Sequence, residues 1–121
     1  MMAQDRLKPG LIITGSHLDA ASDGLLGQAD SVLCPVLSSV EMTPVSDDAK
    51  GVCEAMGRGM QAFAHVYSAM RADIDLLFTL GDRFEMFSAA AASIPFNIPV
   101  AHLHGGETSL GSVDETYRHC I

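Results

Sequence analysis

Two apolar runs that each end in glycine and charged residues constrain the fold of this chain more than any other feature. The run at residues 75–80 precedes Gly81-Asp82-Arg83, and the run at residues 99–104 precedes Gly105-Gly106-Glu107. Short runs of large apolar side chains are typical of strands buried in a parallel sheet. Because such strands end at the same edge, the charged residues are expected to meet at the carboxyl edge, where open α/β sheets bind ligands.

A long helical pattern precedes the first of these strands. From Ser46 to Met70, apolar side chains recur every three or four residues, which predicts one buried stripe and Ser46 as the N-cap. Gly57 and Gly59 inside this helix predict close packing against a neighbouring element. The expected stripe consists of Val52, Met56, Met60, Phe63, Tyr67 and Met70.

Further strands and helices alternate along the chain. Strands are expected at residues 11–14 and, more weakly, at residues 31–37, where Pro35 favours an edge position. Helices are expected at residues 84–93 and from Ser112 or Val113 onward. Strand and helix in short alternation predict an α/β fold with a Rossmann-like, doubly wound parallel sheet.

Composition narrows the class of partner. The 121 residues suffice for one domain at most, and the net charge of −8 disfavours nucleic acid or an anionic membrane as the partner. A small molecule is the expected ligand. No secretory signal or membrane span is present in the sequence, so the cytoplasm is the expected location. The three scattered cysteines match neither a disulfide framework nor a zinc site.

Asp82, Arg83 and Glu107 are the first candidates for chemistry. An Asp at a strand end can act as general acid or base, and an Arg beside it can hold a phosphate with two hydrogen bonds. The alternative for Asp82 is a helix N-cap, and the alternative for Glu107 is a solvated loop side chain. If Glu107 projects beside Asp82, the two carboxylates can divide the acid and base roles. Gly105 and Gly106 would let the backbone approach a ligand closely.

The last helix contributes a second set of candidates. Asp114 and Arg118 are four residues apart and share one helical face, either as a local ion pair or as groups that bind sugar hydroxyls and phosphate. Glu115 and His119 form a second pair of this spacing, turned away from the first.

Histidines near the strand ends leave two interpretations open. His102 and His104 have the spacing of metal ligands, but no further motif completes a ligand set, and a metal-dependent phosphoester hydrolase is the weaker alternative. His104 at the strand tip is well placed for catalysis or substrate contact. Ser16 and His17 follow the first strand and are expected to shape the mouth of the pocket.

Taken together, these motifs resemble the UDP-N-acetylglucosamine 2-epimerases, and most of all the hydrolysing branch that forms N-acetylmannosamine for sialic acid, related nonulosonic acids or surface polysaccharide. The resemblance runs in order over nearly the whole chain. The segments that carry it are Thr14-Gly15-Ser16-His17-Leu18, Leu80-Gly81-Asp82-Arg83-Phe84-Glu85, Ile98-Pro99-Val100-Ala101-His102, His104-Gly105-Gly106-Glu107-Thr108 and Asp114-Glu115 with Arg118-His119.

The resemblance implies a two-domain fold of the glycosyltransferase B type, with the nucleotide sugar bound between two Rossmann-like halves. Residues 1–121 are similar to part of the amino-terminal half, without its opening strand and without the carboxyl-terminal half, which grips most of the UDP in the family. The family also implies a homo-oligomer and neither metal nor cofactor. By itself such a piece is expected to be inactive, and a non-catalytic sugar-nucleotide-binding or oligomerisation fragment is the other alternative.

The implied reaction eliminates UDP across C1 and C2 of the sugar and then adds water, with inversion at C2. By resemblance Asp82 and Asp114 are the catalytic carboxylates, and Arg83 and Arg118 bind substrate or phosphate. Several relatives carry Glu where this chain has His104, so either Glu107 or His104 takes that acid or base role here.

Overall fold

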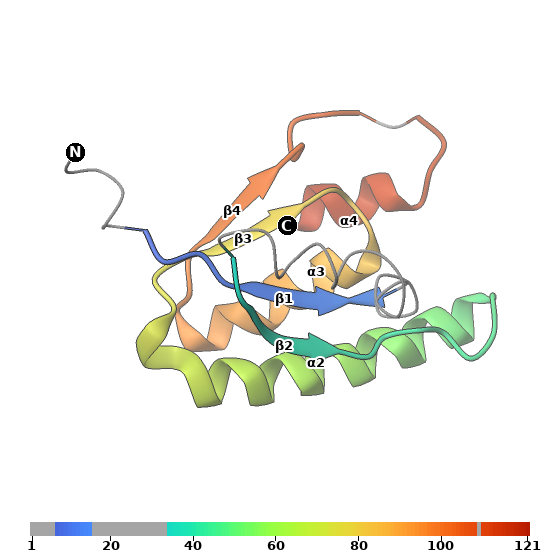
Figure 1. Cartoon of the computed structure of the whole chain (residues 1–121). Coiled ribbons are helices and arrows are strands. Elements are labelled where there is room, and N and C mark those ends of the chain that lie inside the picture. The colour runs from blue at the N-terminus through green and yellow to red at the C-terminus, as the bar shows by residue number, and fades with distance from the viewer. Residues whose placement is uncertain (1–6, 16–33, 109) are drawn as a thin grey trace. The chain divides into compact units, whose positions relative to one another are not determined.

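The computed structural model describes residues 7–15, 34–108 and 110–121, which belong to two compact units, Met1–Glu41 and Met42–Ile121. The expectations for Ser16, His17 and residues 31–33 therefore lie outside the described residues. In the first unit, β1 (Leu11–Thr14) pairs in parallel with β2 (Val36–Val40), as the coloured arrows of Figure 1 show.

The second predicted strand was placed too early in the sequence. It was expected at residues 31–37, whereas β2 begins at Val36, directly after Pro35. Proline has no backbone N–H to donate, but its carbonyl can still accept, and the Leu11 N–H donates to the Pro35 carbonyl at 2.9 Å. Pro35 thus borders the strand pairing instead of lying inside it.

The second unit is built around another parallel pair, β3 (Leu77–Leu80) and β4 (Val100–Leu103), in continuous register from Leu77 opposite Val100 to Leu80 opposite Leu103. Helix α3 (Phe84–Ser93) connects them through a short 3₁₀ turn, η4 (Ile94–Phe96), as Figure 1 shows. The parallel pairing and the intervening helix agree with the α/β prediction. Among the described residues each strand pair forms its own two-stranded sheet.

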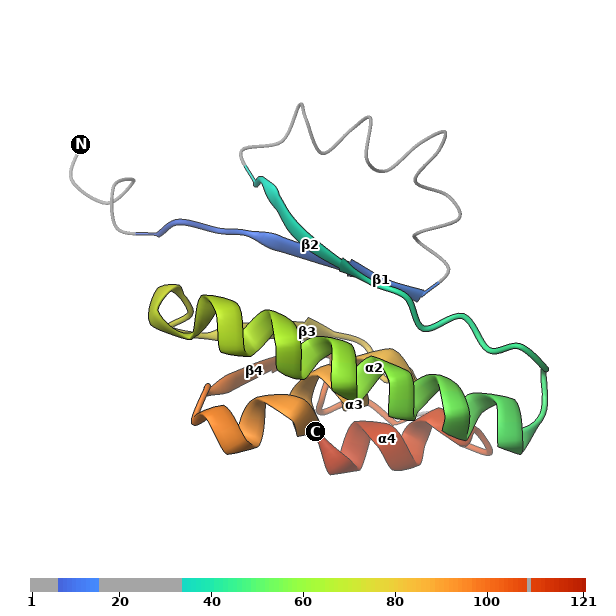
Figure 2. The same cartoon turned by 90° about the horizontal axis from the view of Figure 1, so that it is seen from below.

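Three helices complete the second unit. Helix α3 contacts β3 and also touches α2 (Ala49–Met70) on one side and α4 (Asp114–Cys120) on the other (Figure 2). The covered side of β3 includes Thr79, which is 1% exposed, whereas Phe78 on the opposite face is 62% exposed. None of the helices in the described ranges is long and apolar enough to cross a membrane.

The buried face of α2 differs from the predicted stripe in its first half. Phe63 and Tyr67 are buried as expected, but Met60 is 40% exposed. The reason is Met42, which is fully buried and packs so closely on Gly59 that a Cβ there would lie 2.3 Å from the methionine Cε. Small residues let the two segments approach, and the buried positions of this half are Gly51, Ala55 and Gly59.

The observed N-cap of α2 also lies two residues after the predicted one. Ser46 was expected to be the N-cap, but Asp48 takes that position and accepts a hydrogen bond from the Gly51 N–H at 2.7 Å. The Ser46 hydroxyl donates to the same carboxylate at 2.8 Å. Both donors stabilise the ionised form, and the pKa of Asp48 is lowered from its ordinary value.

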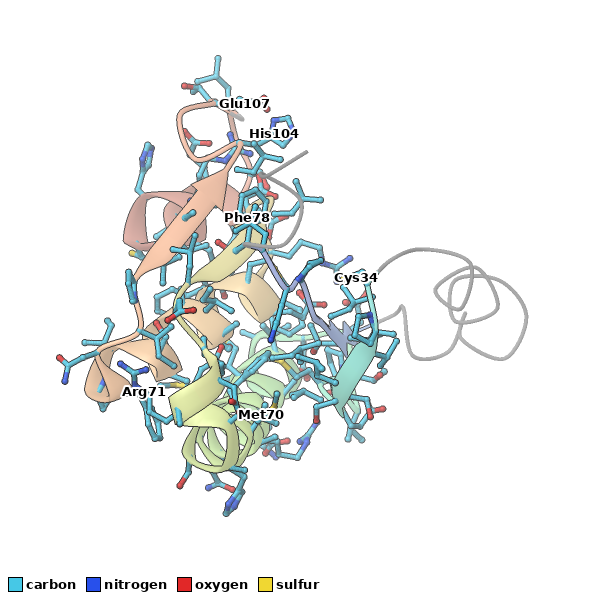
Figure 3. All side chains as sticks on the ribbon, turned by 60° about the vertical axis from the view of Figure 1, so that its left-hand side comes forward. Cys34, Met70, Arg71, Phe78, His104 and Glu107 are labelled. Atoms are coloured by element: carbon cyan, nitrogen blue, oxygen red, sulfur yellow. The ribbon has the colours of Figure 1, made fainter. Side chains whose placement is uncertain are left out.

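Tyr67 and Arg71 fasten the second half of α2 to the rest of the unit. The Tyr67 hydroxyl donates to the Ala89 carbonyl of α3 at 3.0 Å, and burial raises the pKa of this phenol. Arg71 follows at the start of η3 (Arg71–Asp73) and donates to the carbonyls of Phe96 and Asn97 at 2.6 and 3.1 Å. Figure 3 shows Arg71 at this end of α2.

Candidate functional site

The loop after β3 is joined to α4 by a partly buried ion pair. Gly81 turns the chain with a φ of +87°, which favours glycine, and Asp82 follows it. The Asp82 carboxylate accepts a hydrogen bond from the Arg118 guanidinium, and their side chains are 22% and 5% exposed. Arg118 also forms an ion pair with Glu115 at 3.5 Å. Asp82 and Arg118, which are distant in sequence, therefore lie together.

Asp82 is not the cap of the following helix. The residue in the N-cap position of α3 is Arg83, and no side chain caps this helix end. The alternative structural role considered for Asp82 is thus wrong, and its carboxylate is engaged with α4 instead.

Arg83 is held by an acidic neighbour within the same motif. Its Nε donates to Oε2 of Glu85 at 3.2 Å, and its Nη2 lies 3.1 Å from Oε1. The Glu85 side chain is only 7% exposed, whereas that of Arg83 is 59% exposed. Sequence reasoning missed Glu85, although a Glu in the first turn of a helix with apolar neighbours, two residues after an Arg, was a signal that could have suggested this pair.

The loop after β4 is organised by local contacts. His104 adopts a φ of +65°, which is uncommon for a residue with a side chain, and its Nδ1 contacts Oε1 of Glu107. Figure 3 shows these two side chains together at the end of β4. Both are well exposed, at 51% and 61%. The contact that the structure gives to Glu107 is thus local, with a residue of the same loop.

His102 and the two glycines lie just before and within this turn. The His102 Nε2 contacts the Gly81 carbonyl at 2.5 Å, which ties β4 to the loop after β3. A Cβ on Gly105 would lie 2.6 Å from His102 Nδ1, so packing requires a glycine there. Gly106 has open space around its Cα. In the described ranges, no group of three His, Cys, Asp or Glu side chains could hold a metal ion.

A hollow of about 520 Å³ lies where the N-termini of α2, α3 and α4 approach one another. Arg83 and Asp114, two of the predicted site residues, line it together. Tyr117 forms part of the apolar wall and stacks on Phe87, and its pKa is raised, mainly by burial and further by Cys53 and Asp114. The remaining lining residues are Asp47, Asp48, Ala49, Val52, Cys53, Phe84 and Val113.

The second pair predicted on α4 is present. Glu115 accepts a hydrogen bond from His119 at 3.1 Å, on the exposed side of the helix, in addition to its contact with Arg118. The cysteines Cys34, Cys53 and Cys120 are free thiols in the structure.

Parallel strands joined through a helix, with charged residues at the carboxyl ends of the strands, place the chain in the α/β class and are compatible with a Rossmann-like fragment. The family model of the UDP-N-acetylglucosamine 2-epimerases matches residues 1–121, and the chain belongs to this family.

Curated relatives agree with this assignment. The chain is 37% identical over 111 residues to the UDP-N,N'-diacetylbacillosamine 2-epimerase (hydrolyzing) of Legionella pneumophila, a match that covers 92% of this chain and 29% of the relative. It is 32% identical to the GDP/UDP-N,N'-diacetylbacillosamine 2-epimerase (hydrolyzing) of Campylobacter jejuni, with 92% and 28% covered. It is 31% identical to the polysialic acid biosynthesis protein P7 of Escherichia coli, with the same coverage. The chain thus spans less than a third of the length of these relatives.

Proposed function

We propose that this chain supplies part of the active site of a hydrolysing UDP-sugar 2-epimerase. The observation that carries the proposal is the partly buried ion pair between Asp82 and Arg118, which joins the loop after β3 to α4. Next to Asp82 in the sequence, Arg83 lines a hollow together with Asp114. Carboxylates and guanidinium groups of two sequence-distant motifs are thereby concentrated at one edge of the β3–β4 sheet.

The proposed substrate is UDP-N-acetylglucosamine, with N-acetylmannosamine and UDP as products. The two relatives named as diacetylbacillosamine 2-epimerases make UDP-N,N'-diacetylbacillosamine the second candidate. Both compounds carry an acetamido group at C2 and a diphosphate at C1. The acidic lining of the hollow suits sugar hydroxyl groups, which donate hydrogen bonds to carboxylates, whereas the cation of Arg83 at its border suits a phosphate.

The reaction requires a base, an acid and a cation. A base removes the C2 proton while the bond between C1 and the diphosphate oxygen breaks, which gives a glycal and UDP. Water then adds at C1, and an acid returns a proton to C2 from the opposite face. We assign acid and base roles to Asp82 and Asp114, with Glu107 or His104 as the third group, and stabilisation of the departing diphosphate to Arg83 and Arg118.

The domain assignment is part of the same proposal. We propose that residues 1–121 form a partial domain, completed in a longer protein by an opening strand and a carboxyl-terminal half in a glycosyltransferase B type arrangement. The coverage of 29% of the Legionella relative supports this proposal.

A chimera tests the proposal directly. In it, residues 1–121 replace the matching segment of the Legionella relative, and released UDP and free sugar are measured with both candidate substrates. The chimera is expected to turn over at least one of them, whereas the 121-residue chain by itself is expected to release no UDP. Asp82→Asn should lower kcat by roughly 10³-fold because a catalytic acid or base is lost.

The site assignment is resolved by the same assay. Of Glu107→Gln and His104→Gln, the variant with the larger loss of kcat identifies the third acid or base. A chimera that folds as the intact relative does, yet releases no UDP from either substrate, would contradict the proposed function.

A further inference from the structure

Arg83 is the most exposed charged group among the cations proposed to contact substrate, and Glu85 is its partner. Arg118 is almost fully buried and contacts Asp82, whereas the Arg83 side chain is 59% exposed. A free arginine side chain at such a surface would lose considerable rotamer freedom when it binds a ligand. A partner that fixes the guanidinium beforehand reduces this cost.

The contact between Glu85 and Arg83 is bidentate. Both carboxylate oxygens of Glu85 face the guanidinium, one toward Nε at 3.2 Å and the other toward Nη2 at 3.1 Å. This two-point contact sets the plane of the guanidinium as well as its position. Nη1 takes no part in it, and among the described residues Arg83 forms no other hydrogen bond or ion pair. The Nη1 donors thus remain for a ligand.

The burial of Glu85 shows that the pair differs from an ordinary surface ion pair. Exposed pairs between flexible side chains contribute little and hold neither partner in place. The Glu85 carboxylate is 7% exposed and lies on the first turn of α3, whose backbone fixes one end of it. A buried carboxylate is stable only when it is paired with a positive charge or a hydrogen-bond donor. Because α3 fixes the position of Glu85, the carboxylate in turn restricts the position of the Arg83 guanidinium.

From this geometry we propose that Glu85 is a positioning residue, which fixes the guanidinium of Arg83 so that its Nη1 donors meet the diphosphate of the nucleotide sugar. Glu85 does not touch the substrate. This inference rests on the proposed function, and it adds a residue that the family resemblance did not assign.

Whether removal of Glu85 raises or lowers kcat distinguishes a positioning role from a purely electrostatic one. A carboxylate beside Arg83 partly offsets the positive charge, so its removal would strengthen attraction to the diphosphate if charge alone mattered. If position matters, removal frees the guanidinium and weakens stabilisation of the departing UDP. Negative charge on the diphosphate increases as the bond to C1 breaks, and the loss should therefore appear in kcat more than in KM.

The first experiment measures the arginine itself in the 121-residue chain. The ¹⁵N relaxation of the Arg83 Nε–H group is expected to report a restricted side chain in the wild type and a mobile one in Glu85→Gln. Glu54→Gln, which removes the same charge from the exposed side of α2, is the matched control and should leave Arg83 restricted. Equal mobility of Arg83 in the wild type and Glu85→Gln would overturn the inference, whatever the protein's activity.

The second experiment uses the chimera. Glu85→Gln is expected to lower kcat about tenfold, with KM changed by less than about threefold, in the range seen when a group that orients a functional side chain is lost. Arg83→Lys keeps the charge on an exposed side chain but cannot form the bidentate contact, and it should lower kcat to a similar degree. Combining Glu85→Gln with Arg83→Lys should cost little more than either change.

The outcomes of these experiments distinguish the positioning role of Glu85 from the proposed epimerase function. A Glu85→Gln chimera with unchanged or raised kcat would overturn the positioning role and leave the epimerase function intact. A wild-type chimera without turnover would contradict the proposed function, and the relaxation measurement would still decide whether Glu85 holds Arg83.

Discussion

The loops that follow β3 and β4 have similar sequences of glycine and charged residues but different structures. After β3, Asp82 reaches α4 and forms a partly buried ion pair with Arg118, 36 residues further along the chain. After β4, Glu107 forms a pair with His104, only three residues away, and both side chains are exposed. Two strand ends with equivalent positions in the sheet therefore hold their carboxylates in opposite ways.

This difference indicates how the two carboxylates can contribute. Asp82 is fixed by tertiary contacts and is a part of the folded framework, whereas Glu107 belongs to a locally organised loop that can change with little cost to the rest of the molecule. A site that uses both would combine one preset group with one that a substrate can reposition.

Removal of the two carboxylates provides the strongest test of this comparison. Asp82→Ala is expected to lower the free energy of unfolding by about 2 kcal/mol, because the Arg118 guanidinium loses a charged hydrogen-bond partner while its ion pair with Glu115 remains. Glu107→Ala should change it by less than about 0.5 kcal/mol, since exposed ion pairs contribute little. Urea denaturation of both variants measures the difference. Similar losses would show that the two loops are equally embedded.

The glycines of the two loops offer a second, smaller contrast. Gly81 has a φ of +87°, and Gly81→Ala is expected to cost about 1 kcal/mol from backbone strain alone, because nothing lies within 4 Å of the added Cβ. Gly106 has the same open surroundings and no such backbone conformation. Gly106→Ala should therefore be neutral or stabilise by about 0.5 kcal/mol through the unfolded state. Thermal and urea unfolding of the pair test this, and a destabilised Gly106→Ala would contradict it.

The smallest expected effect concerns Asp48, whose carboxylate has local partners like that of Glu107 but lies at a helix N-terminus. The Gly51 N–H and the Ser46 hydroxyl lower its pKa from the ordinary 3.8. A lowered pKa in the folded state stabilises the protein above pH 3.8, and this contribution is lost as the pH falls through the folded-state value. Asp48→Ala should thus lower Tm near neutral pH, with a difference that shrinks in acid. A difference independent of pH would show that the charge is not involved.

Much of the local structure could be predicted because it depends on patterns of neighbouring residues. Helix α3 and strand β1 have the predicted bounds, and β3, β4 and α4 differ from prediction by a residue or two at their ends. The start of β2 and the N-cap of α2 were each misplaced locally, by a few residues, whereas the error in the buried face of α2 arose from a distant residue. Met42 packs on Gly59 and turns small residues inward where the apolar pattern had predicted methionines.

The residues of the candidate site remain a prediction from the sequence, and their contacts could be predicted only in part. Glycines and charges after apolar runs identified Asp82, Arg83 and Glu107, because turn chemistry and strand ends are local properties. The partners of these residues could not be predicted, because they depend on how separate elements pack. Glu85 was missed although it stands two residues after Arg83, because that spacing alone does not show that its carboxylate is buried.

The sequence by itself determined the order of strands and helices, the family, and the placement of charged residues at the ends of β3 and β4. Only the tertiary structure decided that Asp82 meets Arg118, that Glu107 stays with His104, and that Glu85 is buried against Arg83. The physical reason is that the periodicity of side chains is set by the local backbone, whereas the partner that a charge takes depends on distance and burial, which are established when separate elements pack.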